Sequence, residues 1–239
     1  DNTLIQGSSL ILLAQGLFKK RFITLSELAP ALRKQIRYRV SGSENADDIA
    51  EGREQALAVV KGKSVAELKQ ACREIVDNRM LEKSYADTIE LAAMHLAAGQ
   101  QVWLVSATPV QIGQALAETL GFTGALGTVA EEKDGKFTGR LVGDILHGPG
   151  KKHAVAALAA LQQLDLSKCT AYSDSINDLP MLEMVGSPVA INPDRALRKH
   201  AKAQGWAVRD YRSVRRVVRA GVVPAVLAGA GLWWWRRRR

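Results

Sequence analysis

Apolar residues recur at helical spacing through the first hundred positions of this chain. Residues 9–20 carry an apolar side chain every three or four positions, which predicts an amphipathic helix. The same spacing predicts helices over 25–38, 46–60 and 65–78, and very little between 21 and 95 alternates in the manner of a strand. We therefore expect an all-helical block early in the chain.

The pattern changes after residue 100, where short apolar runs alternate with helical stretches. The runs predict strands over residues 101–106, 170–173, 188–191 and 206–208. The helical stretches cover residues 109–120, 151–164, 179–185 and 194–204. Runs at 125–132 and 136–141 flank Asp134-Gly135, a pair typical of a tight hairpin. Strands that alternate with helices predict an α/β fold, a Rossmann-like and mainly parallel sheet with helices on both faces.

Charge is distributed unevenly along the chain. The formal net charge is +9, but residues 209–239 hold nine arginines and one acidic residue and account for +8 of it. The rest is nearly neutral, so we do not expect the fold itself to bind nucleic acid, which needs a basic surface. Cys72 and Cys169 have the spacing of neither a disulfide framework nor a metal site, which suits a reducing cytoplasm.

Two carboxylates four residues apart, Asp174 and Asp178, follow the predicted strand at 170–173. In open α/β sheets, ligands bind at the carboxyl ends of the strands. Protein carboxylates together with a substrate phosphate are the usual ligands of Mg²⁺ in such sites. The pair therefore indicates a magnesium and phosphate site, and the alternative is that Asp178 merely caps the helix that follows.

Three other segments carry groups suited to binding a phosphate. Asp1 and Thr3 precede a polar turn, Ser106 ends a buried strand, and Lys151 follows a glycine-rich start of a helix. A helix start leaves backbone N–H groups free for an anion, and a lysine adds positive charge there. Each has a plainer interpretation: an exposed terminus, a helix cap by Ser106 or, better placed, by Thr108, and a solvated surface lysine.

The order of these segments resembles the haloacid dehalogenase-like (HAD) phosphohydrolases, in the phosphoserine-phosphatase-like branch with a helical cap. The matching phrases are Asp-Asn-Thr-Leu-x-x-Gly-Ser-Ser, Val-Ser-Ala-Thr-Pro, Gly-x-Gly-Lys and Ser-Asp-Ser-x-Asn-Asp-Leu-Pro-Met-Leu, and the likeness extends from residue 1 to about residue 211. It implies a HAD-like core over 1–20 and 96–211, an inserted helical cap over 21–95, and a basic and apolar tail over 212–239.

The first motif of that family is Asp-x-Asp-x-Thr, in which the first Asp attacks phosphorus and the second is the general acid/base. The resemblance makes Asp1 the acid/base, and it places the nucleophile two residues upstream and the first strand before the start of the sequence. It implies Mg²⁺ held by the nucleophile, the Asp1 carbonyl and the Asp174 carboxylate, with Asp178 binding the ion or orienting its water. Ser106 and Lys151 would hold the transferred oxygens.

The resemblance also assigns a role to the helical block, which would close over the site and select the leaving group. Asn177 would bind the substrate, unless it is only a turn residue before the helix. Arg33, Arg37, Arg39 and Arg53 could contact an anionic substrate, although arginine more commonly lies on a solvated face.

The function implied is a Mg²⁺-dependent phosphomonoester hydrolase that acts through an aspartyl-phosphate. Its substrate would be a small phosphorylated metabolite, such as phosphoserine or a lipid-derived phosphate. Two alternatives stay open. One is a non-catalytic module that binds phosphate, or is tethered to a membrane, and lacks the nucleophile. The other is a phosphotransferase that passes the phosphoryl group to an alcohol.

The tail is apolar over residues 221–235 and ends in four arginines. As a helix this run would be about 22 Å long, shorter than the ~30 Å hydrocarbon core of a bilayer. Trp233–Trp235 would suit the membrane interface beside those arginines. We therefore expect a cytoplasmic protein whose tail is a candidate membrane anchor, with a solvated tail as the alternative.

Overall fold

The computed structural model of the protein describes residues 1–27 and 54–212. The predicted tail and the four cap arginines at positions 33, 37, 39 and 53 lie outside the described residues, so their predicted roles stay predictions. Within the described part of the chain, none of the helices combines the length and the apolar character needed to cross a bilayer.

Parallel strands form the framework of the molecule in two groups. Strand β1 (Trp103–Pro109) pairs with β2 (Gly124–Thr128). Strands β5 (Thr170–Ser173), β6 (Ser187–Ile191) and β7 (Ala207–Arg209) pair side by side in that order. Within each group the strands run in the same direction, and helices connect them. The α/β fold with parallel strands is therefore confirmed.

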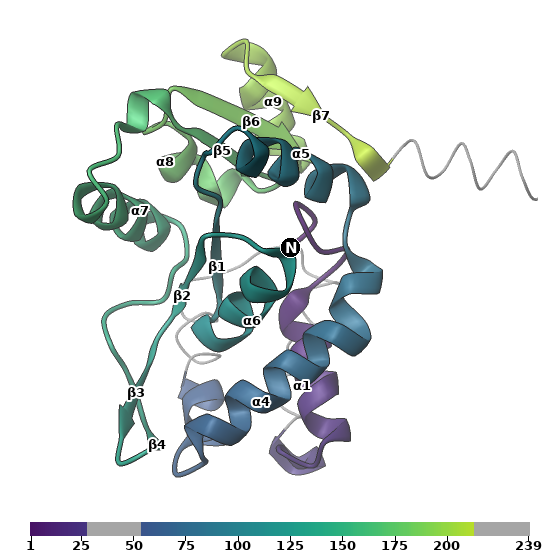
Figure 1. Ribbon diagram of the computed structural model, residues 1–239, viewed down its shortest axis with the longest axis vertical. Coiled ribbons are helices and arrows are strands. Elements are labelled where there is room, and N and C mark those ends of the chain that lie inside the picture. The colour runs from purple at the N-terminus through teal and green to yellow at the C-terminus, as the bar shows by residue number, and fades with distance from the viewer. Residues whose placement is uncertain (28–53, 213–239) are drawn as a thin grey trace, which may run out of the picture.

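Helices surround both groups of strands. They are α1 (Ser9–Lys19), α4 (Val65–Ile75), α5 (Ala86–Ala97), α6 (Val110–Leu120), α7 (Pro149–Leu161), α8 (Leu179–Leu182) and α9 (Arg195–Ala203), and residues 54–60 are also helical. Short helical turns cover Val76–Met80, Leu81–Lys83, Leu166–Lys168 and Ile176–Asp178. Figure 1 shows β5, β6 and β7 near one end of the molecule, α1 and α4 toward the other, and the N-terminus near the middle.

Two hydrophobic clusters hold these layers together. The larger one joins α1, α4 and α6 through buried residues that include Leu17, Ile75 and Leu116. The smaller one joins α8, β6 and α9 through Leu182, Ala190, Leu197 and Ala201, none of which is exposed. Helix α4 of the predicted cap thus shares one apolar cluster with α1 and α6 of the predicted core.

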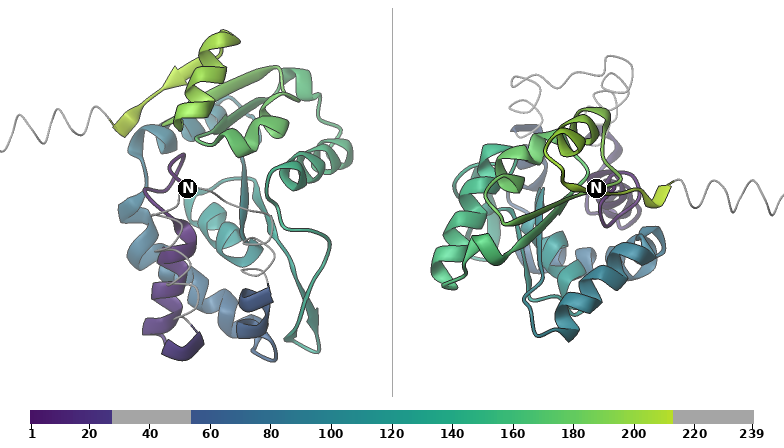
Figure 2. Two further views of the ribbon diagram at one scale, coloured as in Figure 1. Left: turned by 180° about the vertical axis from the view of Figure 1, so that it is seen from behind. Right: turned by 90° about the horizontal axis from the view of Figure 1, so that it is seen from above.

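An antiparallel hairpin extends from the sheet (Figure 2). Its strands are β3 (Ala130–Lys133) and β4 (Lys136–Leu141), and Asp134 and Gly135 between them have positive φ angles of 52° and 73°. The predicted turn is confirmed, because this pair adopts the left-handed backbone that such turns require. The single strand predicted over 125–132 is wrong: its first half pairs with β1 in the sheet, and its second half belongs to the hairpin.

Three predicted helices differ by two residues or more at one or both ends. The α-helix predicted over 65–78 ends at Ile75 and continues as a wider π-type turn over Val76–Met80. The helix predicted over 179–185 covers only Leu179–Leu182. The helix predicted over 151–164 begins two residues earlier and ends at Leu161, which places Lys151 inside its first turn.

The two groups of parallel strands do not pair with each other. Within the described residues, β1 pairs with β2 alone and β5 with β6 alone, so each keeps one unpaired edge. A cavity of about 670 Å³ is lined by residues of both strands, among them Leu104 and Val105 of β1 and Tyr172 of β5. Asp1 lines the same cavity.

Candidate active site

Five of the predicted site residues line this one cavity. They are Asp1, Ser106, Lys151, Asp174 and Asp178. Ser106 lies in β1, Asp174 directly follows β5, and Lys151 lies in the first turn of α7. The structure therefore brings together groups that are up to 177 positions apart in the sequence.

An ion pair between Lys151 and Asp178 forms the centre of the site. The Lys151 Nζ atom lies 2.8 Å from the Asp178 carboxylate, and the two side chains are only 14% and 10% exposed. The Ser173 hydroxyl donates a further hydrogen bond of 2.6 Å to the same carboxylate. Asp178 makes no side-chain capping bond to α8, so the capping alternative for this residue is wrong.

Lys151 reaches the site because of how α7 begins. Gly148 precedes the helix with φ 50° and ψ −115°, a conformation that side-chain-bearing residues adopt only under strain. This turn allows Pro149 to open the helix and places Lys151 in its first turn, where its side chain turns inward. The interpretation of Lys151 as a solvated surface lysine is therefore wrong.

Asp174 is held by the first motif of the chain. The Thr3 hydroxyl donates a hydrogen bond of 2.8 Å to the Asp174 carboxylate, across 171 positions of sequence. Burial raises the pKa of Asp174 above its usual value, because a carboxylate withdrawn from water favours its neutral form. A divalent cation bound here would oppose that shift.

The Asp1 residue is exposed, but its carboxylate and its backbone nitrogen have different neighbours. The carboxylate accepts hydrogen bonds from the Ser9 backbone N–H, at 2.8 Å, and from the Ser9 hydroxyl. The backbone nitrogen of Asp1 is buried and lies near Asp174, Lys151 and Asp178.

Ser106 is half-buried and also lines the cavity. Its oxygen lies 2.9 Å from the Thr108 hydroxyl and accepts a hydrogen bond of 3.2 Å from the Thr108 backbone N–H. Helix α6 begins at Val110, with Pro109 as its capping residue and without a side-chain capping bond. Neither Ser106 nor Thr108 caps the helix, so both capping interpretations are wrong.

Asn177 differs from the other predicted residues. It is exposed, it does not line the cavity between β1 and β5, and its backbone N–H donates to the Ser175 hydroxyl at 3.3 Å. Asn177 therefore belongs to the turn that precedes the helix. The predicted role in binding substrate stays a prediction.

The oxygen atoms of the site suit a hard divalent cation. Within the described residues, no group of three His, Cys, Asp or Glu side chains is arranged to hold a metal ion. The Asp174 carboxylate and the Asp1 carbonyl are nevertheless the kind of oxygen ligand that Mg²⁺ binds, and Mg²⁺ commonly uses few protein carboxylates. Asp178 is already paired with Lys151 and Ser173, so it fits the role of orienting better than that of direct ligation.

Several polar residues of the site were not assigned by the sequence analysis. Ser173 is 2% exposed, and its position at the end of a predicted strand, directly before Asp174, is the local signal that could have identified it. Asn192 and Asp194 hydrogen-bond to the two acidic segments from the loop after β6. Nothing in their local sequence points to those partners, because the contacts join distant parts of the chain.

Comparisons with known proteins identify relatives of this chain. The family model of haloacid dehalogenase-like hydrolases matches residues 1–183. Phosphoserine phosphatase SerB1 of Mycobacterium tuberculosis is 51% identical over 230 residues, which cover 96% of this chain and 75% of that protein. A histidinol-phosphatase of Neisseria meningitidis is 31% identical over 216 residues, covering 89% of this chain and 96% of that protein.

A solved structure has the same fold. The crystal structure of a Bordetella pertussis protein of unknown function superposes with a TM-score of 0.74 at 30% sequence identity, covering 88% of this chain and 95% of that one. The residues matched by the family model include Asp1, Ser106, Lys151 and Asp174. The chain therefore belongs to the haloacid dehalogenase-like hydrolase family, among the phosphatases of its phosphoserine-phosphatase-like branch.

Proposed function

We propose that this protein hydrolyses a small phosphate monoester with Mg²⁺ and through an aspartyl-phosphate intermediate. The observation that carries the proposal is the convergence of Lys151, Ser106, Asp1 and Asp174 on one cavity. A lysine and a hydroxyl supply positive charge and a hydrogen bond for phosphoryl oxygens, and the carboxylates supply acid/base chemistry and metal ligation. This combination suits phosphoryl transfer better than any other reaction class.

The nucleophile in this proposal is an aspartate two residues before Asp1. The family motif Asp-x-Asp-x-Thr places it there, and the proposal is supported by the Asp1 nitrogen, which lies near Asp174, Lys151 and Asp178. A segment bonded to this nitrogen would approach the site through the gap between β1 and β5, whose facing edges are unpaired in the described structure. An apolar strand in that gap would pair with both edges and end at the site.

The proposed reaction has two steps. In the first, the upstream aspartate attacks phosphorus in line, the bond from phosphorus to the leaving oxygen breaks, and the Asp1 carboxyl group donates a proton to that oxygen. In the second, the Asp1 carboxylate removes a proton from a water molecule that attacks the phosphorus of the aspartyl-phosphate. Inorganic phosphate leaves, and the nucleophile is regenerated.

Each remaining side chain has a defined task in these steps. Lys151 and Ser106 hold the non-bridging phosphoryl oxygens and stabilise the charge on them. Asp178 fixes the Lys151 ammonium group by the pair described above. Mg²⁺, which the Asp174 carboxylate, the Asp1 carbonyl and the nucleophile would hold, would neutralise phosphoryl charge when bound.

The relatives suggest a substrate class. Phosphoserine and histidinol phosphate, the substrates in the names of two relatives, are both phosphate esters of an alcohol with an amino group on the neighbouring carbon. We propose this class of amino-alcohol phosphate as the first to test. A lipid-derived phosphate is the second, because of the apolar run in the tail.

The test uses protein that carries an apolar segment ending in Asp-x before Asp1. We expect it to release inorganic phosphate from a generic aryl phosphate and from phosphoserine or histidinol phosphate, with Mg²⁺ and not with EDTA. Inactivity of this protein across a phosphomonoester panel would exclude the phosphatase and leave the non-catalytic phosphate-binding module. Transfer of phosphate to an added alcohol, in place of release to water, would identify the phosphotransferase.

A further inference from the structure

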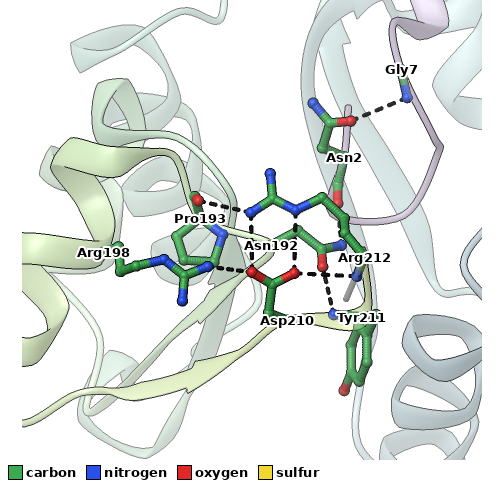
Figure 3. Close-up of polar contacts among 8 residues, drawn as sticks. All are labelled: Asn2, Gly7, Asn192, Pro193, Arg198, Asp210, Tyr211 and Arg212. Atoms are coloured by element: carbon green, nitrogen blue, oxygen red, sulfur yellow. Dashed lines mark hydrogen bonds and ion pairs between the residues drawn. The ribbon is translucent and has the colours of Figure 1, made fainter. Parts of the chain in front are cut away.

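The loop that follows β6, Asn192-Pro193-Asp194, contacts both acidic segments of the site. Asn192 is 1% exposed and has a positive φ of 48°, a left-handed conformation that asparagine tolerates better than most residues. The side chains of Asn2, Asn192 and the residues around them are drawn in Figure 3. We call this loop the brace.

Asn192 connects the first motif to the end of the sheet. Its side-chain Nδ2 donates a hydrogen bond of 2.7 Å to the Asn2 carbonyl, and its Oδ1 accepts one of 2.7 Å from the Tyr211 backbone N–H. Its own backbone N–H donates to the Arg209 carbonyl at 2.7 Å. One buried amide therefore joins residue 2 to the strand end at 209–211.

Asp194 makes the equivalent connection to the second acidic segment. Its backbone N–H donates a hydrogen bond of 2.8 Å to the Asp174 carbonyl, and its carboxylate accepts bonds from the backbone N–H groups of Ile176, at 2.8 Å, and Leu197, at 2.7 Å. The two ends of the brace thus hold the two segments whose side chains meet through the bond between Thr3 and Asp174.

We infer that Asn192 is a positioning residue that sets the orientation of the Asn2 peptide and, through it, the place of Asp1 in the site. Asn2 has a positive φ of 47°, and its own side chain accepts a hydrogen bond of 3.1 Å from the Gly7 backbone N–H. Asn2 thus connects Asp1, whose nitrogen lies near Asp174, to Thr3, whose hydroxyl donates a hydrogen bond to the Asp174 carboxylate. The inference rests on the proposed function, because it concerns the acid/base of that reaction.

The side-chain amide of Asn192 serves one partner as a donor and the other as an acceptor. The substitution Asn192→Asp would retain an acceptor for the Tyr211 N–H but would present a second acceptor to the Asn2 carbonyl, which needs a donor. The substitution Asn192→Gly would tolerate the positive φ and remove the side chain altogether. These two substitutions therefore remove the contact with Asn2 in different ways.

The experiment compares Asn192→Asp and Asn192→Gly with Arg198→Gln. The control breaks the ion pair between Arg198 and Asp210, which lies beside the brace and does not contact Asn2 (Figure 3). In protein that carries the upstream aspartate, we expect both Asn192 variants to lower kcat about 10- to 100-fold while KM changes less than about threefold, because small displacements of a catalytic group cost this much. The control should keep the parent kcat.

Hydrogen exchange provides a second readout that does not need activity. The Gly7 backbone N–H donates to the Asn2 side chain, and the Ser9 backbone N–H donates to the Asp1 carboxylate. Both amides should exchange faster in the Asn192 variants and at the parent rate in the control. An inactive parent enzyme would refute the proposed function, and the exchange data would still decide this inference. A folded Asn192 variant with the kcat and the exchange rates of the parent would overturn the positioning role of Asn192. Loss of the fold in both variants would also overturn it, because Asn192 would then be purely structural.

Discussion

The two groups of parallel strands build their sides of the site in different ways. On the side of β5–β7, Asp178 contacts Lys151 and Ser173, and Asp174 contacts Thr3, so that charged groups are fixed by partners elsewhere in the chain. On the side of β1–β2, the Ser106 hydroxyl is bonded locally, to Thr108 of the same strand. Substitutions on the β5–β7 side should therefore lower both stability and activity, whereas a substitution of Ser106 on the β1–β2 side should lower activity with little loss of stability.

The largest effect is expected for Asp174→Asn in protein with the upstream aspartate. Asparagine keeps an acceptor for the Thr3 hydroxyl but lacks the negative charge that would bind Mg²⁺, so kcat/KM should fall by about 10³. Phosphate release with saturating Mg²⁺ measures this. The control Glu118→Gln, on the exposed face of α6, should retain parent activity. Parent-like turnover of the Asp174 variant would remove this residue from the proposed metal site.

Lys151→Met should destabilise the protein by about 3 kcal/mol, because it leaves the Asp178 charge buried without its cation. The adjacent Lys152 is exposed, so Lys152→Met is the matched control and should change the free energy of unfolding by less than about 0.5 kcal/mol. Urea denaturation in metal-free buffer measures both. Equal effects of the two substitutions would show that the pair adds nothing to stability.

Two serine substitutions compare the two sides directly. Ser173→Ala removes a donor from the buried Asp178 carboxylate and should cost about 2 kcal/mol of unfolding free energy. Ser106→Ala should cost less than about 1 kcal/mol, since its half-buried hydroxyl bonds to its neighbour Thr108 within β1, yet lower kcat/KM about 100-fold. Denaturation and kinetics on the same preparations test the contrast. A larger loss of stability for Ser106→Ala than for Ser173→Ala would contradict this prediction.

The smallest effect concerns the two cysteines. Burial raises the pKa of Cys72 to about 12, so its thiol stays protonated and unreactive at any pH below that range. Cys169 is half-buried, and its sulfur contacts the Asp165 carbonyl at 3.3 Å. A thiol reagent at pH 8 should label Cys169 in the folded protein and label Cys72 only after unfolding, as peptide mass analysis would show. Labelling of Cys72 in the native state would indicate local opening of the cluster around α4.

Sequence patterning predicted the elements whose signals are local. The strand at 170–173 was predicted with its observed limits, and the turn at Asp134-Gly135 and the helix end at Gly121 were also correct. These features depend on apolar periodicity and on backbone conformations that particular residues favour. Errors arose where tertiary pairing decides the outcome, as at 125–132, where one apolar run serves two different strand partners.

The candidate site was predicted in part for the same reason. The residue types and their order predicted Asp1, Ser106, Lys151, Asp174 and Asp178, but Ser106, Lys151 and Asp178 each had a plausible local role as a cap or a surface group. Those three alternatives could be rejected only from the folded chain, where helices α6 and α8 lack side-chain caps and Lys151 is turned inward.

Local patterns along the chain predict most of its strands, turns and helices, and the residue types show which chemical groups it can offer to a phosphate. Which of these groups meet depends on the folded chain. The bond from Asn192 to the Asn2 carbonyl joins positions 190 residues apart, and the bond from Thr3 to Asp174 joins positions 171 apart. Contacts of this kind have no local signal, because they exist only once hydrophobic burial has brought distant segments to the same place.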